Sequence, residues 1–97
     1  MKIYLCGPIS NNKNYKDQFA WVSELLVEYG HEVINPASIE FNPDDGWKEI
    51  MRKDISFMLQ CDAVAIVNTC APSTGQSIEM LVANLVGIPC KDFIEYM

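Results

Sequence analysis

The chain has 97 residues, which is enough for one domain with a single modest core. It is 49% hydrophobic and 21% charged, a balance typical of a folded globular protein and not of a disordered one. The net charge is −6 and no basic run occurs, which argues against binding a nucleic-acid polymer through its phosphates. No apolar stretch approaches the roughly 20 residues that span a bilayer, and "MKIYLCGPIS" is no signal peptide. A cytoplasmic protein without a membrane partner is expected.

The cysteine spacing excludes two common roles. Neither a Cys-x-x-Cys pair nor a metal-ligand spacing occurs, and the single histidine has no partner motif. Free cysteine is among the residue types most often buried. We therefore expect reduced, structural thiols at Cys6, Cys61, Cys70 and Cys90.

The first third of the chain predicts a strand, a helix and a second strand. "KIYLC" (2–6) is a short β-rich run that ends at Gly7-Pro8. A helix is expected over about 15–29, because apolar residues recur with helical spacing at Phe19, Val22, Leu26 and Tyr29. Gly30 suits the position after a helix end, and "HEVIN" (31–35) is the second predicted strand.

The remaining two thirds predict two more helices and two more strands. The turn "FNPDDGW" offers Asp44 or Asp45 as the N-cap of a helix over about 46–60. "DAVAIVN" (62–68) is nearly all apolar, as is typical of a central parallel strand covered on both faces. The last two predicted elements are a helix and a strand, over about 75–86 and 88–94.

Strands that alternate with helices predict right-handed βαβ units. The expected fold is one α/β domain over 1–97, a small doubly wound parallel sheet of about four strands, flavodoxin- or Rossmann-like, with helices on both faces. In such sheets, ligands bind beyond the carboxyl ends of the strands, near the point where the strand order reverses. Three loops fall at that edge and are expected to hold the chemistry: "GPISNNKN", "NPASIEFNPDDG" and "NTCAPSTG".

An acidic residue lies on the apolar face of the predicted second helix. At about 100° per residue, one stripe holds Trp47, Ile50, Met51, Ile55 and Met58. Asp54 falls in the middle of that stripe. A carboxyl group there loses hydration, so it must be paired, protonated or lining a cavity. Helical position alone leaves a structural cap and a functional acid equally open.

A second carboxyl group, Glu79, lies in a last helix that is apolar almost all round. It is either a first-turn acid, stabilised by the positive helix end by ~0.3–1 kcal/mol, or a reactive group held in a pocket. Ser73 and Gln76 likewise fit a capping box. Three observations together favour a small pocket for an anion and a sugar, with an acid and a nucleophile. A strand leads into a glycine-containing loop, and Ser73 and Gly75 lie just before and at the start of a predicted helix. Two semi-buried carboxyl groups come from separate helices.

Three stretches, in order, resemble the nucleoside 2-deoxyribosyltransferase family: "IYLCGPIS", "KDISFMLQCDAVAIV" and "STGQSIEMLVA". The likeness is closest to the hydrolase branch, the 2′-deoxynucleoside 5′-monophosphate N-glycosidases. It extends to short phage and bacterial proteins, mostly without assigned function. The resemblance covers nearly the whole chain, and the ordered set of motifs is moderately specific.

The resemblance implies a role for each matching residue. Glu79 matches the catalytic glutamate, the nucleophile at C1′ of deoxyribose, and Tyr4 matches the strand tyrosine that positions it. Asp54 matches the helix aspartate that helps to protonate the departing base. The first loop, which wraps the base and sugar, is matched by Gly7, Pro8, Ile9 and Ser10.

The loop before the last helix bears on the substrate. Where the resembled transferases carry an acid, the hydrolases carry a serine, and Ser73 stands here. A helix N-terminus favours a phosphate, so Ser73 and Gly75 are expected to bind a nucleotide more readily than a nucleoside. The chain also departs from the family. It offers Lys13 where the hydrolases have an arginine, and Gln76 and Ser77 where the family has smaller residues.

The resemblance thus implies cleavage or transfer at an N-glycosidic bond without a metal or organic cofactor, with retaining geometry and carboxyl groups about 5 Å apart. A rival interpretation, which the departures fit slightly better, is a protein that holds nucleotides or ADP-ribose-type signals without chemistry. A third is an interaction module with a vestigial pocket. The apolar last helix predicts a homodimer or larger homo-oligomer, with Met80, Leu81 or Leu85 at the contact.

Overall fold

The computed structural model describes residues 1–8, 13–67 and 74–97. Its centre is a four-stranded sheet in the order β2-β1-β3-β4, and each neighbouring pair of strands is parallel. The strands are β1 (Lys2–Cys6), β2 (Glu32–Ile34), β3 (Ala63–Ile66) and β4 (Cys90–Asp92). The predicted parallel α/β sheet of about four strands is confirmed.

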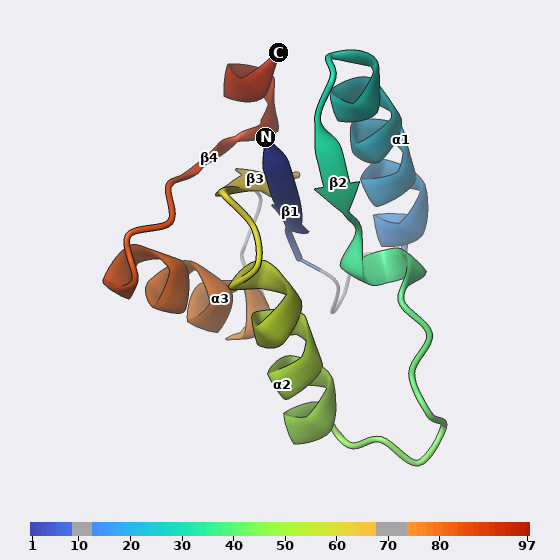
Figure 1. The fold of residues 1–97 in the computed structure, drawn as a ribbon. Helices are drawn as coiled ribbons and strands as arrows, with labels where there is room; N and C mark the ends of the chain where they lie inside the picture. Colours follow the sequence, from blue (N-terminus) through green and yellow to red (C-terminus); the bar gives the residue numbers. More distant parts are fainter. Residues whose placement is uncertain (9–12, 68–73) are drawn as a thin grey trace.

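Helices cover both faces of this sheet, as a doubly wound fold requires (Figure 1). The first face is covered by α1 (Tyr15–Glu28) and the second by α2 (Trp47–Met58) and α3 (Thr74–Leu85). Two short 3₁₀ helices, η1 (Pro36–Ser38) and η2 (Phe93–Tyr96), follow β2 and β4. Within the described part of the chain, no helix has both the length and the apolar character that crossing a membrane requires.

The central strand β1 supplies side chains to two separate cores. Successive side chains of a strand point to opposite faces. Ile3 and Leu5 therefore join Phe19 of α1 in one apolar cluster. Tyr4 and Cys6 face the other way and belong to the cluster formed with α2 and α3. The alternation along β1 thus delivers a phenol and a thiol to the face that carries both candidate acids.

The apolar stripes predicted for the first two helices are correct for their central residues, but each includes one residue at a helix end that is exposed. The buried residues of α1 are Phe19, Val22 and Leu26, as predicted. Tyr29, the C-cap of α1, is 57% exposed, and Trp47, the first residue of α2, is 54% exposed. Both side chains lie at helix ends.

The ends of two helices test the predicted stop and start signals. Gly30, just past α1, has φ of +90°, the left-handed conformation that glycine adopts at low cost. The predicted N-cap of α2 is wrong, because Gly46 occupies that position and makes no side-chain cap. Asp45 instead forms an ion pair with Lys53, two turns into the helix.

The strand order reverses between β1 and β3, so this is the switch point of the sheet. The two strands end side by side, with Cys6 paired in register with Ile66. Both following loops begin at this edge. Three predicted site residues, Ile9, Ser10 and Ser73, lie outside the described residues.

Candidate functional site

Glu79 points into the protein from the second turn of α3. The helix begins at Thr74, and its first turn contains no acidic residue. The interpretation of Glu79 as a first-turn acid beside the helix dipole is therefore wrong. Its side chain is buried, with 7% of the residue exposed. A buried carboxyl group needs polar partners, and β1 supplies them.

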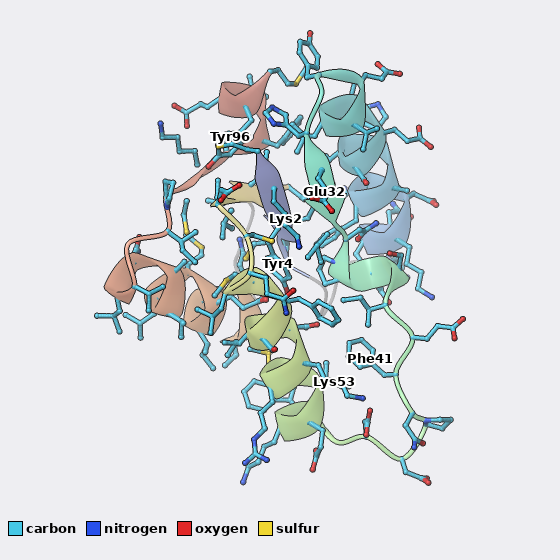
Figure 2. All side chains as sticks on the ribbon, in the orientation of Figure 1. Lys2, Tyr4, Glu32, Phe41, Lys53 and Tyr96 are labelled. Carbon is cyan, nitrogen blue, oxygen red and sulfur yellow. The ribbon has the colours of Figure 1, made fainter. Side chains whose placement is uncertain are left out.

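Two side chains of β1 approach the two oxygens of Glu79. The Tyr4 hydroxyl donates a hydrogen bond to Glu79 Oε2. The Cys6 thiol lies 3.9 Å from Glu79 Oε1 and 3.9 Å from the carbonyl oxygen of Gln76, so it can donate to either. Tyr4 and Cys6 are themselves buried, and Figure 2 marks Tyr4 where β1 meets the helices. The carboxyl group is thus held on both sides by the strand.

The electrostatics of this cluster favour neutral donors around an acid of raised pKa. Burial raises the pKa of Glu79 to about 7; the Tyr4 and Cys6 hydrogen bonds oppose this rise, and the Asp54 charge adds to it. Burial, followed by the Glu79 charge, raises the pKa of both the Tyr4 phenol and the Cys6 thiol. Both therefore stay protonated at neutral pH, which makes them hydrogen-bond donors and excludes a Cys6 thiolate nucleophile.

Asp54, the second acid, lies on α2 and is 6% exposed. Burial raises its pKa to about 6. Its Oδ1 atom is buried and has no hydrogen-bond partner among the described residues. A buried carboxyl oxygen without such a partner can form a hydrogen bond with a bound molecule.

A pocket of about 310 Å³ opens beside Asp54. It lies between the start of α1, the segment that follows β2, and α2. The apolar and aromatic side chains that line it include Tyr15, Ala37, Ile39, Phe41 and Ile50, and polar atoms form a comparable share of its surface. Lys16 is the cation that lines it, and Asp54 is the acid. A pocket that combines apolar and aromatic side chains with a few charged groups can hold a small organic molecule that has both apolar and polar parts.

Two glycines allow the elements around the site to approach closely. A Cβ atom on Gly7 would lie 3.2 Å from the Phe19 ring and 3.3 Å from Val67 Cβ. A Cβ atom on Gly75 would lie 3.2 Å from the Met51 sulfur, so Gly75 lets α3 pack tightly on α2. Pro8, after Gly7, is buried. Both predicted glycines thus have a packing reason to be glycine, whatever they contact in a ligand.

The structure adds residues that sequence reasoning did not assign to the site. Cys6 was expected to be purely structural, although its alternation with Tyr4 along β1 is a signal that could have placed it beside Glu79. Lys16 and Phe41 line the pocket without any local motif that marks them. The described cysteines Cys6, Cys61 and Cys90 are free thiols. No group of three or more metal-ligating side chains is found in residues 1–8, 13–67 and 74–97.

Comparison with known proteins shows where this architecture occurs. The chain is similar in structure to a 2-deoxyribosyltransferase from the psychrotolerant bacterium Bacillus psychrosaccharolyticus, with a TM-score of 0.70 and 20% sequence identity. The match covers 93% of this chain and 69% of that enzyme, and it shows a shared fold. No curated protein sequence matches the chain. The model of one family, described as "Domain of unknown function (DUF4406)", matches residues 1–92, and the chain therefore belongs to that family.

Proposed function

We propose that the protein breaks the N-glycosidic bond of a 2′-deoxyribonucleotide or deoxyribonucleoside, by hydrolysis or by transfer to another base. One observation carries the proposal: the buried carboxyl of Glu79 accepts a hydrogen bond from Tyr4, while a second buried acid, Asp54, lines a pocket. The fold shared with a 2-deoxyribosyltransferase supports it. Glu79 is not among the residues that line this pocket. In the retaining mechanism that we propose, one acid attacks and the other handles the proton, so both must reach the same sugar.

In the first step, Glu79 attacks C1′ of the deoxyribose. A bond forms between C1′ and a Glu79 oxygen as the bond between C1′ and the base nitrogen breaks, and Asp54 gives its proton to the departing base. Tyr4 keeps the glutamate in place. Absence of the 2′-hydroxyl makes the oxocarbenium-like transition state easier to reach, which suits so small a site.

In the second step, water or another base attacks C1′ and releases Glu79 as a carboxylate. The acceptor's proton passes to Asp54, which restores the starting state. Hydrolysis and transfer differ only in this acceptor. No metal or organic cofactor enters either step. Gly75, in the first turn of α3, and Ser73, which precedes that helix in the sequence, are proposed to hold a 5′-phosphate. Gly7, Pro8, Ile9 and Ser10 are proposed to surround the sugar and base.

This scheme requires Glu79 ionised and Asp54 protonated. The hydrogen bonds from Tyr4 and Cys6 lower the pKa of Glu79 and so favour its charged form. Asp54 Oδ1 has no partner among the described residues that would favour a charge there. A base nitrogen that accepts a hydrogen bond from Asp54 further stabilises the protonated acid. In the protein without a ligand, the pKa of Glu79, about 7, lies above that of Asp54, about 6, so the required state is a minority species. That state is most populated between the two pKa values, and we therefore expect activity to peak near pH 6–7.

Chromatography of free base tests the proposal directly. The protein is incubated with each of the four 2′-deoxynucleoside 5′-monophosphates and with the matching nucleosides, with and without a second free base. At least one substrate should release its base, and a new nucleoside or nucleotide will appear if transfer occurs. The matching ribonucleotides are the control and should react far more slowly. Absence of base release from every substrate would refute the enzymatic proposal.

One observation favours a second candidate, a protein that binds nucleotides without chemistry. Gln76, which replaces a smaller residue of the resembled family, is buried with 3% exposed, one turn before Glu79 on α3. A bulky amide there narrows the space beside the candidate nucleophile. Tight binding of a nucleotide or an ADP-ribose-type molecule without base release would favour this function.

We also propose that the protein forms a homodimer or larger homo-oligomer through α3. Leu81, Leu85 and Val86 are exposed by 58%, 77% and 55%, whereas Met80 packs against the core. Burial of these side chains in a symmetric contact would stabilise a dimer. Light scattering should show a dimer or larger species that Leu81→Asp with Leu85→Asp converts to a monomer. Ile94→Asp, at an exposed residue of η2, should leave it intact; a monomeric unmodified protein would contradict the proposal.

A further inference from the structure

The pocket beside Asp54 has one wall that does not belong to a helix or strand. Phe41 lines the pocket from the segment that joins η1 to α2. Figure 2 shows Phe41 projecting from this segment toward α2, with Lys53 close to it. A side chain on an irregular segment has no regular hydrogen-bonded backbone to fix it. Its position therefore depends on the contacts that the segment makes.

Lys53 of α2 supplies these contacts. Its ammonium group lies over the Phe41 ring, 5.6 Å from the centroid, within the range of a cation–π interaction. The same nitrogen lies 2.8 Å from Asp45 Oδ2, at the other end of the segment. Asp45 Oδ2 also accepts a hydrogen bond from the Asn42 backbone N–H at 3.2 Å. The segment is thus tied to α2 at Phe41 and again at Asp45.

These ties fix a position more than they stabilise the fold. The Lys53 side chain is 47% exposed, and an ion pair that faces water contributes little to the free energy of folding. The hydrogen bond from Lys53 lowers the pKa of Asp45, so the pair remains charged at neutral pH. What the pair holds in place is an aromatic ring at the edge of the pocket that Asp54 also lines.

A held aromatic ring beside an unpartnered carboxyl oxygen suits one class of ligand. A planar heteroaromatic ring can stack on Phe41 and offer an N–H group or a ring nitrogen to Asp54. Aromatic side chains bind bases mainly through such stacking. A saturated or branched group could contact the apolar side chains of the pocket but could not stack on the Phe41 ring.

We propose that Phe41 is a specificity-determining residue, whose ring stacks on the base of the substrate and limits the size of base that enters. Lys53 and Asp45 act through Phe41 as positioning residues. This inference rests on the proposed function, because it assigns the pocket to the base that departs beside Asp54.

Binding of free nucleobases tests the inference without any need for turnover. Adenine, guanine, cytosine and thymine are titrated into the protein and followed by NMR. Phe41→Ala should weaken the binding of the preferred base about tenfold or more, the usual effect of losing one stacking contact. Phe41→Tyr keeps the flat face and should bind within about twofold of the unmodified protein. Phe41→Leu keeps an apolar side chain but loses the flat aromatic ring, so its affinity for the base should be close to that of Phe41→Ala.

Matched variants test the two positioning residues. Lys53→Met keeps the apolar stem and loses the charge, and Asp45→Asn removes the acid; each should weaken base binding about two- to fivefold. The controls are Lys48→Met on the same helix and Asp44→Asn beside Asp45, both at exposed residues, and they should bind the base normally. High salt should weaken binding in the unmodified protein and have less effect in Lys53→Met, because that variant has no ion pair to screen.

If the protein turns over, Phe41→Ala should raise KM more than it lowers kcat and should change the preference between purine and pyrimidine substrates at least about fivefold. Base binding that depends on Phe41 in a protein without turnover would support the inference and refute the proposed function. Turnover with an unchanged KM for every base in Phe41→Ala and Phe41→Leu would overturn the inference while the proposed function stands. Failure of all four bases to bind the unmodified protein would also overturn it.

Discussion

Replacing Glu79 with glutamine is expected to abolish base release and, at the same time, to make the folded protein more stable at neutral pH. Loss of the nucleophile should lower kcat by about 10³-fold or more. Glutamine keeps the size of the side chain and an oxygen that can accept the hydrogen bond from Tyr4. It removes the negative charge, which burial disfavours.

The gain in stability should depend on pH. The pKa of Glu79 rises from 4.5 to about 7 on folding, so the folded state holds this proton more tightly than the unfolded chain does. Below about pH 4.5, both states are protonated and the favourable contribution is complete; it is lost as pH rises through about 7. Glu79→Gln should therefore gain little at pH 4.5 and on the order of 2 kcal/mol above pH 7.

Urea unfolding at pH 5 and pH 8 measures this difference. Glu24→Gln, at an exposed glutamate of α1, is the matched control and should change the free energy of unfolding at neither pH. An equal effect of Glu79→Gln at both pH values would show that the carboxyl group is not strained by burial. Full retention of base release in Glu79→Gln would exclude this residue as the nucleophile.

The fold could be predicted because its signals are local. The spacing of Phe19, Val22 and Leu26 places one face of α1 in the core, and the structure buries these three residues. Periodicity carries no information about where the covering sheet stops. Tyr29 and Trp47 continue the apolar stripes in the sequence, but their side chains are exposed in the structure.

The candidate site could be predicted only in part, because its contacts join residues far apart in the chain. Asp54 on an apolar stripe is a local anomaly that the sequence displays. The hydrogen bond between Tyr4 and Glu79 spans 75 positions and depends on the sheet order and on the packing of α3. The N-cap prediction at Asp45 failed because Gly46 precedes the first residue of α2, and the Asp45 carboxylate pairs with Lys53 instead. The sequence does not show that Lys53 pairs with Asp45, and no motif in it indicates that Phe41 lines a pocket.

Replacing Tyr4 with phenylalanine should separate its polar role from its packing role. Phenylalanine keeps the ring in the core and removes only the hydroxyl that donates to Glu79. Because that hydrogen bond lowers the pKa of Glu79, the variant should raise the pKa of Glu79 further. A larger fraction of Glu79 is then protonated at pH 7. The ionised Glu79 that remains lacks the hydrogen bond from Tyr4 that keeps it in place for attack on C1′. Turnover at pH 7 should fall about 10- to 100-fold.

Two measurements check this expectation. Carbon-13 NMR of the glutamate carboxyl groups reports the pKa of Glu79 without turnover, and the pH optimum of kcat/KM should move to higher pH. Stability should fall by about 1 kcal/mol at pH 5, where a neutral hydrogen bond is lost, and by more at pH 8, where Glu79 must be charged without its donor.

Tyr96→Phe provides the matched control for Tyr4→Phe. Tyr96 is partly buried and belongs to η2, and its hydroxyl donates to the Val64 carbonyl oxygen at 2.9 Å. Loss of this bond should lower stability by about 1 kcal/mol at both pH values and leave the pKa of Glu79 unchanged. If Tyr4 served only as a core residue, Tyr4→Phe would behave in the same way. A shift of the Glu79 pKa in one variant and not in the other therefore identifies Tyr4 as the residue that sets the charge of the candidate nucleophile.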